Sequence, residues 1–212
     1  MNITEMVELF QKNRVPYLRN HILNPPNNHN AIISQWGRWW IEDTNNLGSN
    51  RGIFDEAIEC EGRRADIMFL EQSADKIFKI KGVAEIENNI NDDEDKYREK
   101  LGTLTLYDKS TEKFPDLKFA ILSALMVIDK NNTAIDFFTP LLEDIRNHSK
   151  DSRLSWIIFL LFKVPYTTEY QEVNTPHKLG SKTTIFGRYM QEGAYAIFKE
   201  GKELNRINWP IQ

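Results

Sequence analysis

The chain has 212 residues, of which 41% are hydrophobic and 27% charged, a profile typical of a water-soluble globular protein rather than a disordered or fibrous one. Its formal net charge of −4 and sequence pI of about 5.7 argue against a basic coat for nucleic acid but allow a local basic groove. The single cysteine, Cys60, excludes an internal disulfide, and a chain of this length can bury a core without one.

The sequence predicts a single domain over residues 1–212, with no membrane partner. The longest apolar run, residues 156–162, is far shorter than the ~20 residues of a membrane helix. The first residues lack the cationic start and apolar middle of a secretory signal, so we expect a cytoplasmic protein. We expect the core at about 31–164, followed by a C-terminal extension at about 165–212.

Two helices are predicted before the first strand. Asn2 and Glu5 have the spacing of a capping box for a short helix, which the Pro- and Asn-rich residues 24–30 end. A second helix is predicted over about 31–44, where apolar residues recur at helical spacing. Three of its tryptophans are predicted to anchor the core, namely Trp36, Trp39 and Trp40.

An antiparallel meander of three strands is predicted next. Residues 57–60 and 65–70 are short apolar runs separated by the turn-forming residues 61–64, which is typical of a hairpin. Residues 77–87 follow as the third strand. A helix then begins near Asp92 or Asp93, either of which can cap it.

The second half of the chain is predicted to alternate strand, helix and strand. The nearly continuous apolar runs at 118–128 and 154–164 predict parallel strands buried on both faces. Between them, Thr139 and Pro140 supply a cap and a first-turn proline for a helix. The tail, about 183–204, has roughly helical spacing interrupted by glycines and predicts a broken helix. The predicted fold class is α/β, with a mixed sheet flanked by helices in a three-layer core.

Three acids on the meander form the main candidate site. Glu85 and Glu87 lie two positions apart on one strand and therefore share a face. Asp66 on the preceding strand alternates with apolar residues, so burial makes it protonate or recruit a cation. An oxygen-only donor set suits Mg²⁺, which combines one or two carboxylates with water and substrate phosphate, and Mn²⁺ is expected to substitute.

These residues resemble the PD-(D/E)XK nuclease superfamily, which includes many restriction endonucleases and repair or recombination nucleases. The resemblance covers about residues 31–164. It is carried by EGRRADIMFL, with the family Asp at Asp66, and by VAEIENN, with the family Glu-x-Lys pair at Glu85 and Glu87. The resemblance implies a restriction endonuclease-like fold and a metal-dependent nuclease that acts on DNA, as a symmetric dimer if it makes double-strand breaks.

The resemblance also implies roles for individual residues. Asp66 and Glu85 would ligate the metal, and Glu42, from the helix before the meander, would join them. Glu87 stands where the family has lysine, giving a Glu-x-Glu variant. Either Glu87 acts as a base or an extra metal ligand, or a lysine such as Lys96 or Lys100 reaches in from the next helix.

The same charged residues also have purely structural interpretations. Glu85 and Glu87 could form a solvated strand face whose charge Lys79 and Lys81 balance, and Asp66 could pair with Arg63 or Arg64 at the strand end. Basic residues that could meet DNA phosphates are Arg63, Arg64, Lys178, Lys182 and Arg188.

Two functions rival the nuclease. One is a catalytically inactive module of the same fold that binds DNA or a protein, which the missing family lysine favours. The other is an unrelated α/β interaction protein with a surface network of ion pairs.

Overall fold

The computed structural model describes residues 33, 34, 36, 37, 40, 41, 50–55, 58–87, 94–127, 134–165 and 188–206. Several predictions fall outside these residues. They are the helix capped by Asn2, the turn at 24–30, and the placement of Trp39, Glu42, Lys178 and Lys182.

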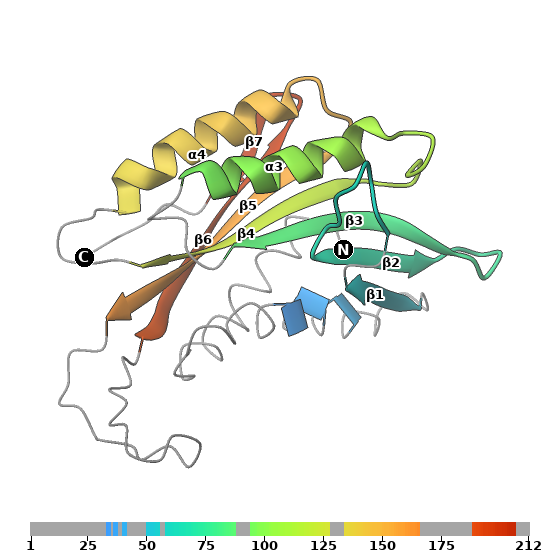
Figure 1. The fold of residues 1–212 in the computed structure, drawn as a ribbon, viewed down its shortest axis with the longest axis horizontal. Coiled ribbons are helices and arrows are strands. Elements are labelled where there is room, and N and C mark those ends of the chain that lie inside the picture. Colours follow the sequence, from blue (N-terminus) through green and yellow to red (C-terminus); the bar gives the residue numbers. More distant parts are fainter. Residues whose placement is uncertain are drawn as a thin grey trace, which may run out of the picture.

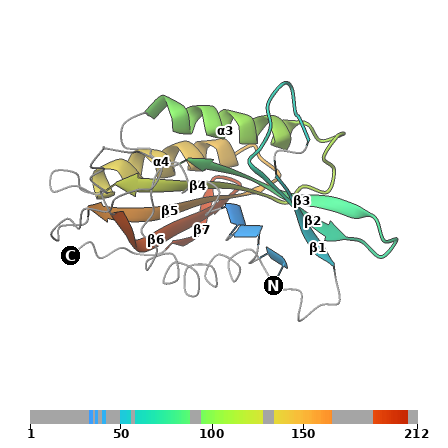
Figure 2. The same cartoon turned by 60° about the horizontal axis from the view of Figure 1, so that its bottom comes forward.

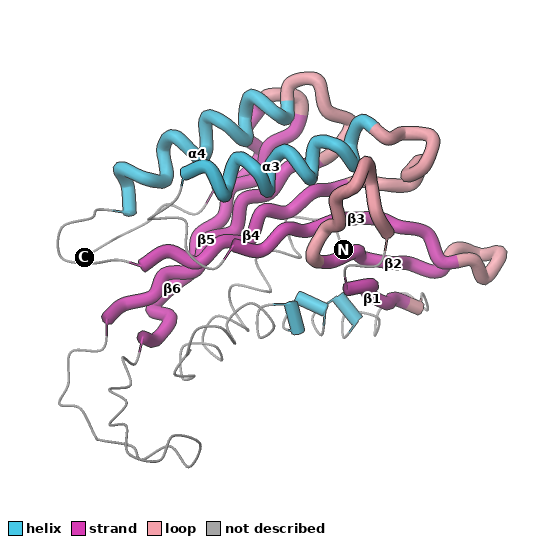
Figure 3. Tube along the Cα trace, in the orientation of Figure 1, coloured by secondary structure: helices cyan, strands magenta, loops and turns pink. Residues whose placement is uncertain are grey.

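A seven-stranded mixed sheet forms the centre of the protein, with its strands side by side in chain order (Figures 1 and 3). The strands are β1 (Arg51–Asp55), β2 (Ile67–Gln72), β3 (Phe78–Glu87), β4 (Phe119–Val127), β5 (Ser155–Pro165), β6 (Arg188–Lys199) and β7 (Lys202–Arg206). The β3–β4 and β4–β5 pairs are parallel and all the others antiparallel. The predicted α/β class with a mixed sheet is confirmed.

Helices cover both faces of this sheet. The helices α3 (Glu94–Lys109) and α4 (Ala134–Ser149) lie on one face, while the helical residues within 33–41 lie on the other (Figure 2). The helix α3 connects β3 to β4, and α4 connects β4 to β5. Each helix therefore returns the chain to the same end of the sheet, which allows the next strand to be parallel.

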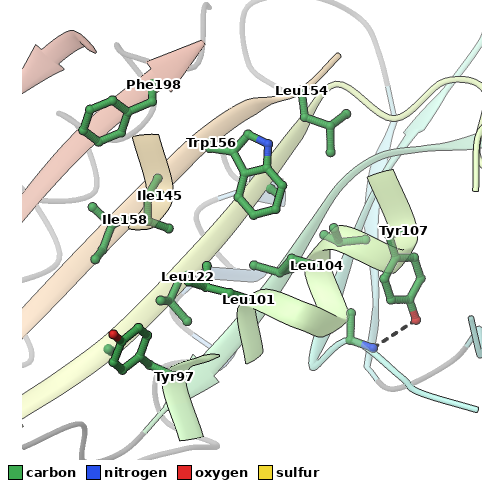
Figure 4. Packing of buried hydrophobic residues seen from close by; sticks show 14 of the residues in the cluster. Tyr97, Leu101, Leu104, Tyr107, Leu122, Ile145, Leu154, Trp156, Ile158 and Phe198 are labelled. Carbon is green, nitrogen blue, oxygen red and sulfur yellow. Dashed lines mark hydrogen bonds between the residues drawn. The ribbon is translucent and has the colours of Figure 1, made fainter. Parts of the chain in front are cut away.

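Each face of the sheet has its own apolar core. Under α3 and α4, Leu101 and Leu104 pack with Leu122, Trp156 and Ile158, as Figure 4 shows. On the other face, the core residues come from the helical segment and the strands, and include Trp36, Trp40, Phe69, Ile121 and Phe159.

The buried tryptophans on the second face also satisfy their indole N–H groups. Trp36 donates to the hydroxyl of Ser123 at 3.1 Å, and Trp40 donates to the carbonyl of Leu70 at 2.8 Å. Because buried polar groups need partners, these bonds fix where each ring sits. The prediction that Trp36 and Trp40 anchor the core is confirmed.

The first strand lies earlier than predicted. It spans Arg51–Asp55, whereas of the described residues 58–60 only Cys60 has a ladder contact, an isolated bridge to Arg63. The predicted tight turn exists between these two residues, with positive φ at Glu61 and Gly62. It closes a small loop rather than joining two strands of the sheet, so the predicted hairpin was wrong.

The remaining differences concern α4 and the tail. The helix α4 begins at Ala134, so Pro140 lies inside the helix. The prediction that Pro140 lies in the first turn was wrong. The broken helix predicted at 183–204 is wrong over its described part, residues 188–204, because β6 and β7 form a hairpin there. Its turn has positive φ at Glu200 and Gly201, which suits a two-residue hairpin loop. Successive residues of β6, such as Ala196 and Ile197, are buried on opposite faces of the sheet. The sequence of β6 therefore lacks the alternation of apolar and polar residues that marks a strand with one exposed face.

Gly82 is a position where β3 accepts no side chain. A Cβ added there would lie 2.0–2.6 Å from ring atoms of Phe119 on β4, and that ring is packed against Trp40 and Phe69. We expect Gly82→Ala to lower the free energy of unfolding by about 1–3 kcal/mol, the usual cost of overpacking a core. Urea denaturation measures the change. The matched control is Gly52→Ala on β1, where the nearest atom would be 3.8 Å away; an equal loss in both variants would contradict the argument.

Candidate active site

Glu85 is a buried acid on the face of β3 that α3 covers. Val83, two residues earlier, belongs to the core under α3, and residues two apart on a strand share a face. Only 1% of the Glu85 side chain is exposed. A carboxylate in such surroundings loses its hydration and needs a cation, a proton or hydrogen-bond donors.

Asp66 lies beside Glu85, immediately before β2. The β2–β3 ladder pairs Ile67 with Ala84, so the next step of this antiparallel pair brings Asp66 opposite Glu85. Oδ2 of Asp66 accepts a 2.7 Å hydrogen bond from the backbone N–H of Ile86. The start of β2 and the end of β3 therefore bring two acids together, and the acid that precedes β2 is also bonded to the backbone of β3.

Lys100 on α3 supplies a cation to both acids. Its Nζ lies 2.7 Å from Oε2 of Glu85 and 3.2 Å from Oδ2 of Asp66. The side chain is 27% exposed, so solvent reaches it while its two partners are buried. We call Asp66, Glu85 and Lys100 the acid–lysine triad. If all three groups are ionised, the triad carries one negative charge in excess.

The electrostatics of the triad follow from this excess. Burial raises the pKa of Glu85 to about 8, and repulsion from Asp66 adds to the rise, while Lys100 opposes it. For Lys100, burial alone would lower the pKa, but attraction to Glu85 and Asp66 outweighs it and the pKa is raised. Glu85 therefore holds a proton at neutral pH unless a further positive charge replaces that proton.

Tyr107 holds the segment that leads to Asp66. Its hydroxyl group accepts a 3.0 Å bond from the N–H of Ala65, drawn in Figure 4, and donates a 2.6 Å bond to the carbonyl of Ile58. The ring is fully buried under α3. The helix thus positions Asp66 through its neighbour Ala65, in addition to supplying Lys100. The sequence prediction missed this residue, although a tyrosine within a buried helical stripe is a signal that its hydroxyl needs a partner.

The donor set of the triad fits a hard divalent cation. Oxygens of Asp66 and Glu85 converge on one point, at present the Lys100 nitrogen, and Mg²⁺ commonly takes one or two carboxylates, the remaining ligands being water and substrate oxygens. Within the part of the chain that the structure describes, no group of three or more His, Cys, Asp or Glu side chains is placed to hold a metal ion. Among the described residues, the protein part of such a site would be these two carboxylates.

Two other acids and a lysine were predicted at this site. Glu87 ends β3 and is partly buried. Lys96 is exposed one turn before Lys100 on α3. On a helix that buries Tyr97, Leu101 and Leu104, position 100 lies closer than position 96 to the middle of the buried stripe, which explains why Lys100 reaches the acids. Glu42 lies outside the described residues.

The lysines that were predicted to balance Glu85 and Glu87 on a solvated strand face pair with another acid. Lys79 and Lys81 lie 3.6 and 3.3 Å from the carboxylate of Asp116, not beside Glu85. A bulge in the β2–β3 ladder, where Phe69 pairs with Gly82 and Leu70 with Ile80, breaks the alternation between Lys81 and Val83. The predicted row of balanced charges on one strand face is therefore wrong.

The predicted DNA-contacting residues lie in three places. Arg63 donates to the Glu99 carbonyl of α3 at 3.1 Å, and Arg64 lies 3.8 Å from a carboxylate oxygen of Glu59, so neither pairs with Asp66. The backbone of Arg188 begins β6. Lys178 and Lys182 lie outside the described residues.

Comparison with other proteins leaves the triad as the main guide to function. No family model, curated protein or solved structure matches the chain. Among the described residues, no helix has both the length and the apolar character needed to cross a membrane.

Proposed function

We propose that this chain is a metal-dependent endonuclease that hydrolyses phosphodiester bonds in DNA. The observation that carries the proposal is the acid–lysine triad, in which two buried carboxylates from neighbouring strands converge on one cation. Bound there, Mg²⁺ would supply a Lewis acid and a positive charge for the scissile phosphate. Asp66 and Glu85 would hold the ion, and Mn²⁺ would substitute for Mg²⁺ at the same site.

The position of Lys100 supports this proposal where the sequence departs from the family pattern. The resemblance implies a lysine at position 87, and the chain has glutamate there. Lys100 brings an ammonium group to Glu85 from α3 instead. In our proposal Lys100 faces the substrate phosphate, and Glu87 orients or deprotonates the attacking water.

The order of the elements also supports the proposal. Helical residues within 33–41, three antiparallel strands, α3, and a strand parallel to β3 follow one another along the chain. The resemblance implies a helix before the meander and another after it, and we propose the three-layer restriction endonuclease-like arrangement for residues 31–164. We further propose a cytoplasmic enzyme that would act as a symmetric dimer if it cuts both strands, since the described residues of a chain contain one triad.

Plasmid cleavage with Mg²⁺ or Mn²⁺ tests the proposed function. We expect Asp66→Asn and Glu85→Gln each to reduce the cleavage rate by about 10²–10⁴-fold, because each removes a carboxylate that the reaction needs while preserving side-chain shape. The matched control is Glu59→Gln, an exposed acid near the same loop, which should leave the rate unchanged. Cleavage by Asp66→Asn at the wild-type rate would refute the proposal.

A second candidate function is a catalytically inactive module that binds DNA or a protein. The observation that favours it is that Lys100 already bonds to both acids, as a purely structural ion network would. Binding of a DNA duplex without metal-dependent cutting, measured with the same plasmid and variants, would decide for this candidate.

A further inference from the structure

One nitrogen atom occupies the point on which the two acids converge. Nζ of Lys100 donates to Oε2 of Glu85 and to Oδ2 of Asp66, and that Asp66 oxygen also accepts the N–H of Ile86. The oxygens that face each other are therefore already bonded to the ammonium. Any other cation that binds between these same two oxygens has to take the same place.

We propose that Lys100 and a divalent metal ion exclude each other at the acid–lysine triad, so that the ammonium must leave Asp66 and Glu85 when the ion binds. This inference rests on the proposed metal-dependent function. Mg²⁺ binds oxygen at about 2.0–2.1 Å, closer than the 2.7 and 3.2 Å of the ammonium contacts. An ion between the same two oxygens would lie against Nζ, and two positive groups in contact in a buried site repel strongly.

Lys100 can leave without disturbing the helix that carries it. Its neighbours Tyr97, Leu101 and Leu104 anchor α3 in the core, whereas its own side chain is 27% exposed. A lysine has a flexible four-carbon stem, so Nζ can swing toward solvent while the backbone of α3 stays in place. The displaced ammonium would remain within a side-chain length of the two acids, where it is available to an anionic substrate.

The charges allow this exchange. A divalent ion balances the two carboxylates by itself, so it can replace both the ammonium and the proton that Glu85 holds at neutral pH. The buried acids are then neutralised by the ion, and one ammonium and one proton are released.

Amine labelling of the wild-type chain tests the inference directly. The chain is pulsed with an acetylating reagent at increasing Mn²⁺, and modification of Lys100 is measured by mass spectrometry, with the exposed Lys96 as internal reference. Calorimetric titration in the same buffer measures Mn²⁺ uptake. We expect Lys100 labelling to rise roughly tenfold as Mn²⁺ binds, because two charge-assisted hydrogen bonds are lost, while Lys96 labelling stays constant.

The matched variant is Asp66→Asn. It keeps an acceptor for the Ile86 N–H but loses one of the two carboxylates, so Lys100 should label faster without metal and show no further rise with it. Mn²⁺ uptake by the wild type with unchanged Lys100 labelling would overturn the exclusion and leave the proposed nuclease standing. Absence of Mn²⁺ uptake, together with absence of cleavage, would overturn the proposed function and the exclusion with it.

Discussion

Replacing Lys100 with methionine is expected to lower the free energy of unfolding by about 3 kcal/mol at pH 9, because it leaves two buried carboxylates without their cation. At pH 9 Glu85 is ionised, since its pKa is raised to about 8 by burial and by Asp66. At pH 6 Glu85 carries a proton, so the same substitution should cost less. Urea denaturation followed by tryptophan fluorescence at both pH values measures the difference, with Trp36 and Trp156 as buried reporters.

Two further variants isolate the cause of this loss. Lys96→Met removes an exposed lysine one turn away and should change stability by no more than about 0.5 kcal/mol. The double variant Glu85→Gln/Lys100→Met removes one of the acids together with the cation and should recover part of the loss, as a double-mutant cycle measures. An equal cost of Lys100→Met at pH 6 and pH 9 would contradict the ionic explanation.

The stability of the folded chain is expected to fall as the pH rises from about 5 to 8. The pKa of Glu85 moves from 4.5 to about 8 on folding, first because burial disfavours the carboxylate and then because Asp66 repels it. Between these values the folded chain binds a proton that the unfolded chain has released, so each rise in pH favours unfolding. The contribution from Glu85 is complete below pH 4.5, falls by about 1.4 kcal/mol per pH unit at its steepest, and is lost above pH 8.

Glu85→Gln tests this assignment, because glutamine does not titrate. Its stability should vary less than that of the wild type between pH 5 and 8, measured by thermal or urea unfolding at several pH values. If both proteins show the same slope in that range, another group is responsible.

Much of the fold could be predicted from the sequence, since local patterns report burial directly. The runs that became β3, β4 and β5 were found to within about two residues because their apolar residues are continuous or alternate clearly. Prediction failed for β6, where both faces are buried and the spacing imitates a helix. It also failed for β1, whose five residues lack an apolar run and are ordered by pairing with β2.

The candidate site was predictable only in part. Asp66 and Glu85 could be matched because strand alternation and an acid in an apolar strand are visible in the sequence. The contact with Lys100 depends on the orientation in which α3 packs on the sheet. The sequence indicates that orientation only through the stripe of apolar residues along the helix. Tyr107 acts through two backbone groups, and although its place in a buried helical stripe signals that its hydroxyl needs a partner, the sequence does not identify those groups.

The acid–lysine triad is encoded within a continuous stretch of chain, residues 66–100, which forms β2, β3 and the first turns of α3. A candidate site confined to one ββα unit depends little on chain segments that are remote in sequence. Loops elsewhere could then be lengthened or exchanged during evolution while the arrangement of the two acids and the lysine is inherited intact with that unit.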